Sequence, residues 1–193
     1  MVFDLEGSTL PTAYPAALWT ELLRLVPQLA EEKLAGVLPL RAAENKDGIL
    51  LTKRTKLVLR VPKALAGHTA ARLSGSTMQI GSIPISIGQS KPRAILPYPT
   101  IHAQQVAGVS DEVLFMDDIR KQLSEMGIAA KLICGKRSAI KGDQQTTHAY
   151  SLVAHDLKPD DSLQLQYAGL GINRQFGYGI FIPYKVISGL SED

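Results

Sequence analysis

A glycine-rich segment near the C-terminus has the composition of a loop that contacts phosphate. Backbone amides in such a loop can form an anion nest, and a guanidinium at its centre adds a bidentate phosphate contact. The alternative is that the glycines serve only the dihedral angles of tight turns. We predict phosphate contacts from Gly169, Gly171, Arg174, Gln175, Gly177 and Gly179.

Two nucleotide-binding interpretations of this segment fail. A dinucleotide-binding fingerprint needs a third glycine where Arg174 stands, and it follows a strand and opens a helix. Here a helix is expected before the glycines and a strand after them. A phosphate-binding loop of the nucleotidase type ends in Gly-Lys-Ser or Gly-Lys-Thr, which this segment lacks. The segment therefore predicts a close approach to a phosphate backbone rather than a nucleotide pocket.

Two other stretches, residues 51–63 and 131–141, concentrate positive charge and contain no acidic residue. The net charge of the whole chain is only +3, so the clustering is more informative than the total. The second stretch predicts a basic hairpin that can lie beside an RNA stem. In the stretch 51–63, Lys53 and Arg54 would face opposite sides of a strand, so only one of them can face a given RNA path. The alternative to RNA contact is a solvated edge strand whose lysines prevent pairing with another strand. The nucleic-acid contacts predicted here are Lys53, Lys56, Lys136, Arg137 and Lys141.

The titratable residues do not form a metal-binding pattern. The four histidines, His68, His102, His148 and His155, lack metal-ligand spacing. The adjacent acidic pairs Asp117-Asp118 and Asp160-Asp161 point to different faces of their helices, so they do not make a two-metal site. The single cysteine allows neither a disulfide framework nor a cysteine-based zinc site. We therefore predict no metal and no cofactor.

Length and composition limit the class of protein. The 193 residues suffice for one medium domain or two small ones, and 45% apolar residues can build a core. Aromatic residues make up only 6%, so few are available for stacking on bases. The N-terminus is not typical of a signal peptide, and no run of about 18 apolar residues occurs. We expect a cytoplasmic protein that does not span a membrane.

The predicted elements that must position these residues follow the order β-α-β-β-α-β twice. In the first half we expect strands at 1–7, 49–52 and 56–61, a strand pair at 78–87 and an extended segment at 37–41. Helices are expected from Pro15 to Val26 and at 62–73. In the second half we expect strands at 101–106, 131–140, 147–154 and 179–186, and helices from the N-cap Ser110 to Gly127 and at 159–168. This predicts an α+β protein of two tandem ferredoxin-like domains, residues 1–92 and 93–193.

An ordered set of motifs across nearly the whole chain resembles the CRISPR precursor-RNA processing endoribonucleases of the MYXAN subtype. These belong to the repeat-associated RNA-binding superfamily, whose glycine-rich signature the segment from Gly169 to Pro183 resembles. The other supporting stretches are Asp4 to Gly7 with Leu10-Pro11, Leu51 to Leu57, Asp111-Glu112, Leu123 to Ile128, Ile133 to Arg137, and Ser162 to Gln166.

The resemblance implies two ferredoxin-like domains that bind a CRISPR repeat, often as a short stem-loop, and cleave it without metal. In that chemistry the 2′-hydroxyl attacks the adjacent phosphate and leaves a cyclic phosphate and a 5′-hydroxyl. The reaction needs a base, an acid and cations for the phosphorane charge. The resemblance also implies that the protein stays on its product with other CRISPR effector subunits.

The sequence departs from the family pattern where the catalytic base is expected. A histidine is usual just before the first helix and before the first hairpin, but here Ala13-Tyr14 and Val37 to Arg41 stand there. The candidate catalytic residues are therefore Tyr14, Arg41 and Arg54. Tyr14 is a poor base unless its pKa is depressed.

Three explanations remain for the missing histidines. Tyr14 replaces them, or a residue such as His102 or His148 has taken over, or the protein binds repeat RNA with little or no cleavage. The leading hypothesis is a metal-independent endoribonuclease that matures CRISPR RNA. A non-catalytic repeat-binding subunit and an unrelated ferredoxin-like regulatory or metabolic module are the alternatives.

Overall fold

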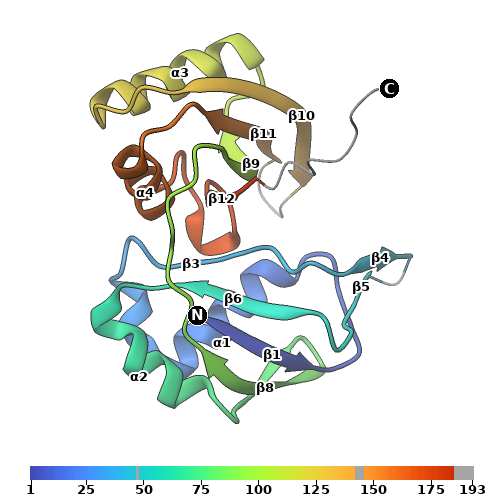
Figure 1. Ribbon diagram of the computed structural model, residues 1–193. Coiled ribbons are helices and arrows are strands. Elements are labelled where there is room, and N and C mark those ends of the chain that lie inside the picture. The colour runs from blue at the N-terminus through green and yellow to red at the C-terminus, as the bar shows by residue number, and fades with distance from the viewer. Residues whose placement is uncertain (47, 142–145, 185–193) are drawn as a thin grey trace, which may run out of the picture. The chain divides into compact units, whose positions relative to one another are not determined.

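The computed structural model describes residues 1–46, 48–141 and 146–184 of the chain (Figure 1). The chain forms two compact units. Among the described residues, the N-terminal unit comprises Met1–Ala94 together with Asn173–Gly177, and the C-terminal unit comprises Ile95–Ile172 and the segment 178–184. The sequence placed a boundary between residues 92 and 93 and assigned the segment 173–177 to the second domain.

The main sheet of the N-terminal unit has five strands in the order β3-β6-β1-β8-β7. They are β1 (Val2–Glu6), β3 (Gly36–Val37), β6 (Lys56–Arg60), β7 (Thr77–Ile80) and β8 (Ile83–Lys91). Neighbouring strands are antiparallel throughout this sheet. Buried Phe3 and Leu5 alternate with more exposed residues along β1, because successive side chains of a strand point to opposite faces.

Two helices, α1 (Tyr14–Leu25) and α2 (Lys63–Leu73), also contribute buried side chains to this core (Figure 1). In α1 the buried residues Tyr14, Leu18 and Leu22 recur every four positions and so form one apolar stripe. Pro15 lies in the first turn, where its missing N–H has no helical partner to lose. Leu18 and Leu22 join Leu57 and Leu59 of β6 in one cluster of buried side chains.

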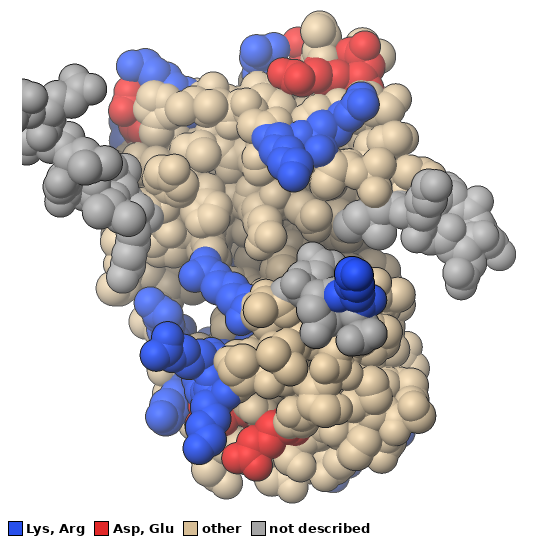
Figure 2. Space-filling model, turned by 90° about the vertical axis from the view of Figure 1, so that its right-hand side faces the viewer, with Lys and Arg blue, Asp and Glu red and all other residues tan. Residues whose placement is uncertain are grey.

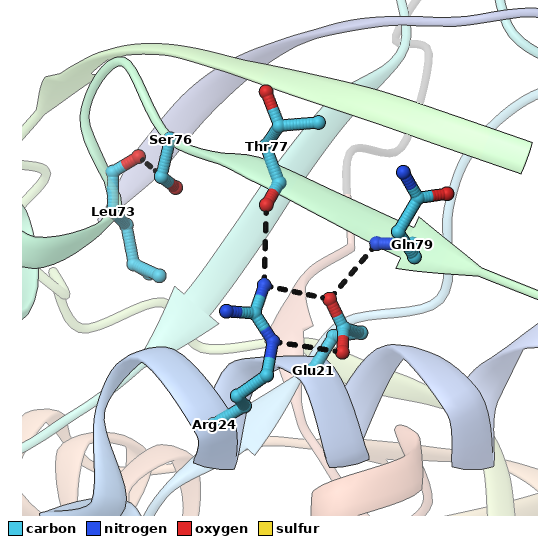
Figure 3. A network of polar contacts seen from close by, with 6 residues as sticks. All are labelled: Glu21, Arg24, Leu73, Ser76, Thr77 and Gln79. Atoms are coloured by element: carbon cyan, nitrogen blue, oxygen red, sulfur yellow. Dashed lines mark hydrogen bonds and ion pairs between the residues drawn. The ribbon is translucent and has the colours of Figure 1, made fainter.

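A network of polar contacts joins α1 to the edge strand β7 (Figure 3). Arg24 donates from Nε and Nη2 to the carboxylate of Glu21, at 3.0 and 2.9 Å, and Nη2 also reaches the carbonyl of Thr77 at 3.3 Å. Glu21 in turn accepts the amide of Gln79 at 2.8 Å. These contacts lower the pKa of Glu21, chiefly through the hydrogen bond from Arg24.

The N-terminal unit also has a small second sheet. It has the order β2-β5-β4 and consists of β2 (Thr9–Leu10), β4 (Ala43–Asn45) and β5 (Gly48–Leu50). A short 3₁₀ helix, η1 (Pro27–Ala30), follows α1 because Pro27 cannot continue the α-helical hydrogen-bond ladder.

The C-terminal unit has a four-stranded antiparallel sheet in the order β10-β11-β9-β12. Its strands are β9 (Ile101–Gly108), β10 (Lys131–Lys141), β11 (Thr146–His155) and β12 (Ile182–Pro183). The helices are α3 (Glu112–Glu125) and α4 (Pro159–Ala168), whose Phe115, Ile119 and Leu165 are buried against Leu152 of the sheet. A 3₁₀ helix, η2 (Arg174–Phe176), lies between α4 and β12.

In both units the first strand lies between two later strands, β1 between β6 and β8 and β9 between β11 and β12. This is the ferredoxin-like order, and the predicted fold class is confirmed. Local details differ from the prediction. Asp111, not Ser110, caps α3, because its carboxylate accepts the amide of Leu114 at 3.0 Å. The last strand is short within the described residues, Ile182–Pro183. In the part of the chain that the structure describes, no helix combines the length and apolar character needed to cross a membrane.

Candidate functional site

A small open hollow lies in the N-terminal unit at the start of α1. It is lined by Tyr14, Pro15, Leu18, Val37, Leu38, Pro39, Gln175 and Phe176. The last two come from η2, so the glycine-rich segment supplies one wall and the N-terminal half supplies the rest. The hollow thus brings together two candidates, Tyr14 and Gln175, that lie 161 positions apart in the sequence.

The hydroxyl of Tyr14 has a hydrogen-bond partner in the backbone, and its pKa is shifted. Its ring is buried, and its oxygen accepts the amide hydrogen of Leu40 at 2.9 Å. Burial raises the pKa of Tyr14, against a smaller lowering by the bond from Leu40. Tyr14 therefore lacks the depressed pKa that a tyrosine base would need. A protonated phenol whose oxygen already accepts one hydrogen bond still has its own proton to donate.

The segment Asn173–Gly177 is packed closely on the N-terminal unit. Asn173 and Gly177, at the two ends of η2, have positive φ angles of 65° and 98°. A Cβ on Gly177 would lie 2.9 Å from Cδ of Pro39 and 3.0 Å from the carbonyl of Val37, so only glycine fits there. The Nε of Arg174 donates to the carbonyl of Leu34 at 3.0 Å, and burial lowers the pKa of its guanidinium to about 10. Arg174 is thus a packed, hydrogen-bonded residue.

The amides of the four glycines already have acceptors within the protein. Gly169 donates to the carbonyl of Leu165 at 2.9 Å, and Gly177 to that of Arg174 at 3.0 Å. Gly179 donates to the carbonyl of Gln105 at 2.7 Å, and Gly171 to Oε1 of Gln122 at 3.0 Å. The expectation of an anion nest is wrong for these amides, because none of the four is left to face a ligand. RNA contact by other atoms of this segment stays a prediction.

Exposed cations lie in the tight turn Thr52–Lys56, which follows β5 and ends at the first residue of β6. Lys53 and Arg54 are both exposed, and they lie in the turn rather than on a strand. The expectation that they face opposite sides of a strand is therefore wrong. Lys56 differs from them, because its Nζ pairs with Oδ1 of Asp4 at 2.5 Å.

Arg41 is exposed and directly follows Leu40, whose amide binds the Tyr14 hydroxyl. All three catalytic candidates, Tyr14, Arg41 and Arg54, belong to the N-terminal unit. Figure 2 shows several Lys and Arg side chains gathered on one face of that unit, in the lower part of the view. The N-terminal unit thus carries both exposed cations, which can hold a phosphate backbone by charge, and a neutral proton donor.

The basic hairpin of the C-terminal unit presents one cation at a bulge and holds another by a hydrogen bond. The register of β10 shifts between Cys134 and Arg137, and exposed Lys136 lies at this shift. Exposed Arg137 donates from Nη1 to the carbonyl of Ser110 at 3.1 Å, and Tyr150 donates to the same carbonyl at 2.6 Å. The side chain of the third candidate, Lys141, lies outside the described residues.

Comparisons with known proteins decide the family. The model of a family described as "Cas6 Crispr" matches residues 1–186. This chain belongs to the Cas6 family. The CRISPR-associated endonuclease Cas6 of Myxococcus xanthus (strain DK1622) is 28% identical over 186 residues, which are 95% of this chain and 80% of the relative.

Solved structures agree with the Cas6 fold. A structure named CRISPR associated protein Cas6 superposes with a TM-score of 0.71 at 11% identity, covering 95% of this chain and 98% of that chain. A RAMP protein described as binding different RNA substrates gives a TM-score of 0.70 at 14% identity, covering 93% of this chain and 97% of that chain. The family predicted from the motifs is confirmed, and the alternative of an unrelated regulatory or metabolic module is overturned.

None of the four histidines is among the residues that line the Tyr14 hollow. His68 is exposed on α2, and the other three belong to the C-terminal unit. His102 packs edge-on against Tyr184, with ring centroids 5.3 Å apart, and Nδ1 of His155 lies 3.3 Å from Oδ1 of Asp156. The Nδ1 of His148 is buried without a hydrogen-bond partner among the described residues. Neither His102 nor His148 lines the hollow, and a catalytic role for either residue stays a prediction.

Sequence reasoning missed two residues that hold the candidates in place. Asp4, in the motif from Asp4 to Gly7, pairs with Lys56, and the amide of Leu40 fixes Tyr14. The motif marked Asp4 as a residue of interest in the sequence. Its pairing with Lys56 follows only from the antiparallel register of β1 and β6, which sets the two residues opposite each other. No local pattern could reveal a backbone amide as the partner of a side chain 26 positions away.

Proposed function

We propose that this Cas6 protein is a metal-independent endoribonuclease that binds CRISPR repeat RNA and cleaves it with the RNA's own 2′-hydroxyl. Family membership over residues 1–186 supports the substrate class. The observation that carries the chemistry is the protonated, hydrogen-bonded Tyr14 in a hollow of the same unit that exposes Arg41, Lys53 and Arg54.

In the proposed step, the 2′-oxygen forms a bond to phosphorus while the bond from phosphorus to the 5′-oxygen breaks. The proton of the 2′-hydroxyl passes to solvent, and the departing 5′-oxygen takes the proton of the Tyr14 hydroxyl. Solvent then returns a proton to the phenolate. Arg41 and Arg54 stabilise the charge on the phosphorane, because a guanidinium fork suits two phosphate oxygens. The products are a 2′,3′-cyclic phosphate and a 5′-hydroxyl.

This division of roles differs from catalysis by a histidine pair in its pH dependence. With solvent as the proton acceptor and an acid of raised pKa, the rate rises with pH across the neutral range and does not fall near pH 7. A histidine pair that acts as base and acid would give a bell-shaped profile near the usual histidine pKa of about 6.5.

The decisive experiment incubates the full chain with synthetic RNA of the CRISPR repeat found in its own genome, in EDTA. We expect a single cut that leaves a cyclic phosphate. A matched RNA with one 2′-deoxy nucleotide before the scissile phosphate should bind equally well and remain uncut. Cleavage of the deoxy RNA, or cleavage that EDTA abolishes, would contradict the mechanism.

A second candidate is a non-catalytic subunit that binds and protects the repeat. It is favoured by one observation, namely that no histidine precedes His68 while burial raises the pKa of Tyr14. Tight binding of the repeat without any cut over hours would support it. In either case we propose that the bound RNA is retained for other effector subunits, which a slow dissociation rate of the cleaved repeat would test.

A further inference from the structure

The turn Thr52–Lys56 is closed by several hydrogen bonds of its own. The amide of Thr55 donates to the carbonyl of Thr52 at 2.9 Å, and the amide of Thr52 donates to Oγ1 of Thr55 at 3.1 Å. The amide of Arg54 donates to Oγ1 of Thr52 at 3.2 Å. Thr55 is fully buried, while Lys53 and Arg54 next to it are exposed. A buried anchor therefore fixes the backbone that carries two exposed cations.

Lys56 ties the end of this turn to β1. Its Nζ lies 2.5 Å from Oδ1 of Asp4 and donates to the carbonyl of Lys53 at 2.9 Å. Asp4 and Lys56 are directly opposite each other in the register of β1 and β6. One ammonium group thus bridges a carboxylate on β1 and the carbonyl of the residue that starts the exposed pair.

We propose that Asp4 and Thr55 are positioning residues for RNA binding, which hold the Thr52–Lys56 turn so that Lys53 and Arg54 meet phosphates of the repeat at a fixed spacing. This inference rests on the proposed function. A turn whose cations are already fixed loses less conformational entropy when it binds than a free loop does. Lys56 is the link that fixes the turn, and Lys53 and Arg54 are the residues that contact RNA.

The net charge of the surface and the positioning role predict opposite effects of substituting Asp4 on RNA binding. The substitution Asp4→Asn removes a negative charge beside a basic turn, so a binding surface governed only by charge should attract RNA more strongly. The positioning role predicts weaker binding, because the freed Lys56 no longer holds the carbonyl of Lys53. The sign of the change therefore separates the two explanations.

The matched control is Glu6→Gln, which makes the same change of charge on the same strand. Glu6 is exposed, stands opposite Ser86 on β8, and takes no part in the bonds of the turn. We expect Asp4→Asn to weaken the Kd for repeat RNA by about two- to fivefold, the size of an exposed ion pair. Glu6→Gln should leave the Kd unchanged or tighten it slightly. Asp4→Glu should restore part of the loss.

A second variant, Thr55→Val, keeps the shape of the buried side chain and removes the oxygen that accepts the amide of Thr52. This variant should also bind repeat RNA more weakly than wild type. A double-mutant test uses Asp4→Asn with Lys56→Met. The effects of these two substitutions on the Kd should not add, because both break the ion pair between Asp4 and Lys56. Thermal unfolding shows whether each variant is folded at the assay temperature.

Three outcomes are decisive. The inference is supported if Asp4→Asn binds repeat RNA more weakly than wild type while Glu6→Gln binds it equally tightly or more tightly. Equal or tighter binding by Asp4→Asn, with wild type binding the repeat normally, overturns the inference alone. If the wild-type chain has no preference for repeat RNA over a scrambled RNA, the proposed function fails, and the positioning role fails with it.

Discussion

The two parts of the chain that the sequence singled out, the basic turn Thr52–Lys56 and the glycine-rich segment 169–179, differ in how their polar groups are used. In the turn, hydrogen bonds fix the backbone and leave Lys53 and Arg54 exposed. In the glycine-rich segment, the four glycine amides and Arg174 are all bonded within the protein. The comparison teaches that a glycine-rich segment can reflect close packing alone, whereas the turn keeps two cations exposed on a fixed backbone.

The substitution Gly179→Ala should have the largest effect. Gly179 has a φ of +66°, and its Cβ would lie 1.9 Å from the carbonyl oxygen of Leu170. Gly127→Ala is the control, because φ is +70° there and no heavy atom lies within 4 Å of the added carbon. We expect a loss in the free energy of unfolding of about 3 kcal/mol for Gly179→Ala and about 1 kcal/mol for Gly127→Ala. Urea denaturation measures both, and equal losses would contradict the packing role.

Next in size is Tyr14→Phe, which removes the hydroxyl and keeps the buried ring. We expect the single-turnover cleavage rate to fall by about 100-fold, typical of losing a general acid. The Kd for the repeat should change by less than about twofold, since the hydroxyl is buried and bonded to Leu40. An unchanged rate would remove Tyr14 from the catalytic set and favour a different acid.

The variant Arg174→Ala tests the glycine-rich segment directly. Its bond to the carbonyl of Leu34 predicts a loss in the free energy of unfolding of about 1–3 kcal/mol, as for a buried charged hydrogen bond. RNA contact by the same residue, which the sequence predicted, would weaken the Kd by a similar free energy. Measuring both quantities separates a packing role from RNA contact. Weaker RNA binding with an unchanged free energy of unfolding would show that Arg174 contacts RNA and would contradict the packing role.

The smallest effect concerns the contact between α1 and β7 in the N-terminal unit (Figure 3). The folded pKa of Glu21 lies below its ordinary value of 4.5, so its contribution to stability is complete above about that pH and is lost as the pH falls through the folded pKa. Glu21→Gln should cost about 0.5 kcal/mol at pH 7, as for an exposed ion pair. The difference from wild type should vanish in acid, and a constant difference down to pH 3 would contradict the assignment.

Much of the fold followed from local patterns. Apolar residues with helical spacing, such as Leu18 and Leu22, predicted α1, and alternation predicted β1, because each pattern fits only one repeat of the backbone. The cap of α3 was misplaced by one residue, since Ser110 and Asp111 can both accept an amide hydrogen and only the geometry selects Asp111. The motifs also identified the Cas6 family, because the ordered set extends over nearly the whole chain.

The sequence by itself determined the residue types available for chemistry: no histidine before His68, a tyrosine at the start of α1, and two clusters of cations. Only the tertiary structure decided their states. Burial raises the pKa of Tyr14 and keeps it protonated. The register of β1 and β6 pairs Lys56 with Asp4, while Lys53 and Arg54 stay exposed. The physical reason is that a pKa, an ion pair and an exposed charge depend on neighbours that are distant in sequence, and folding alone brings those neighbours together.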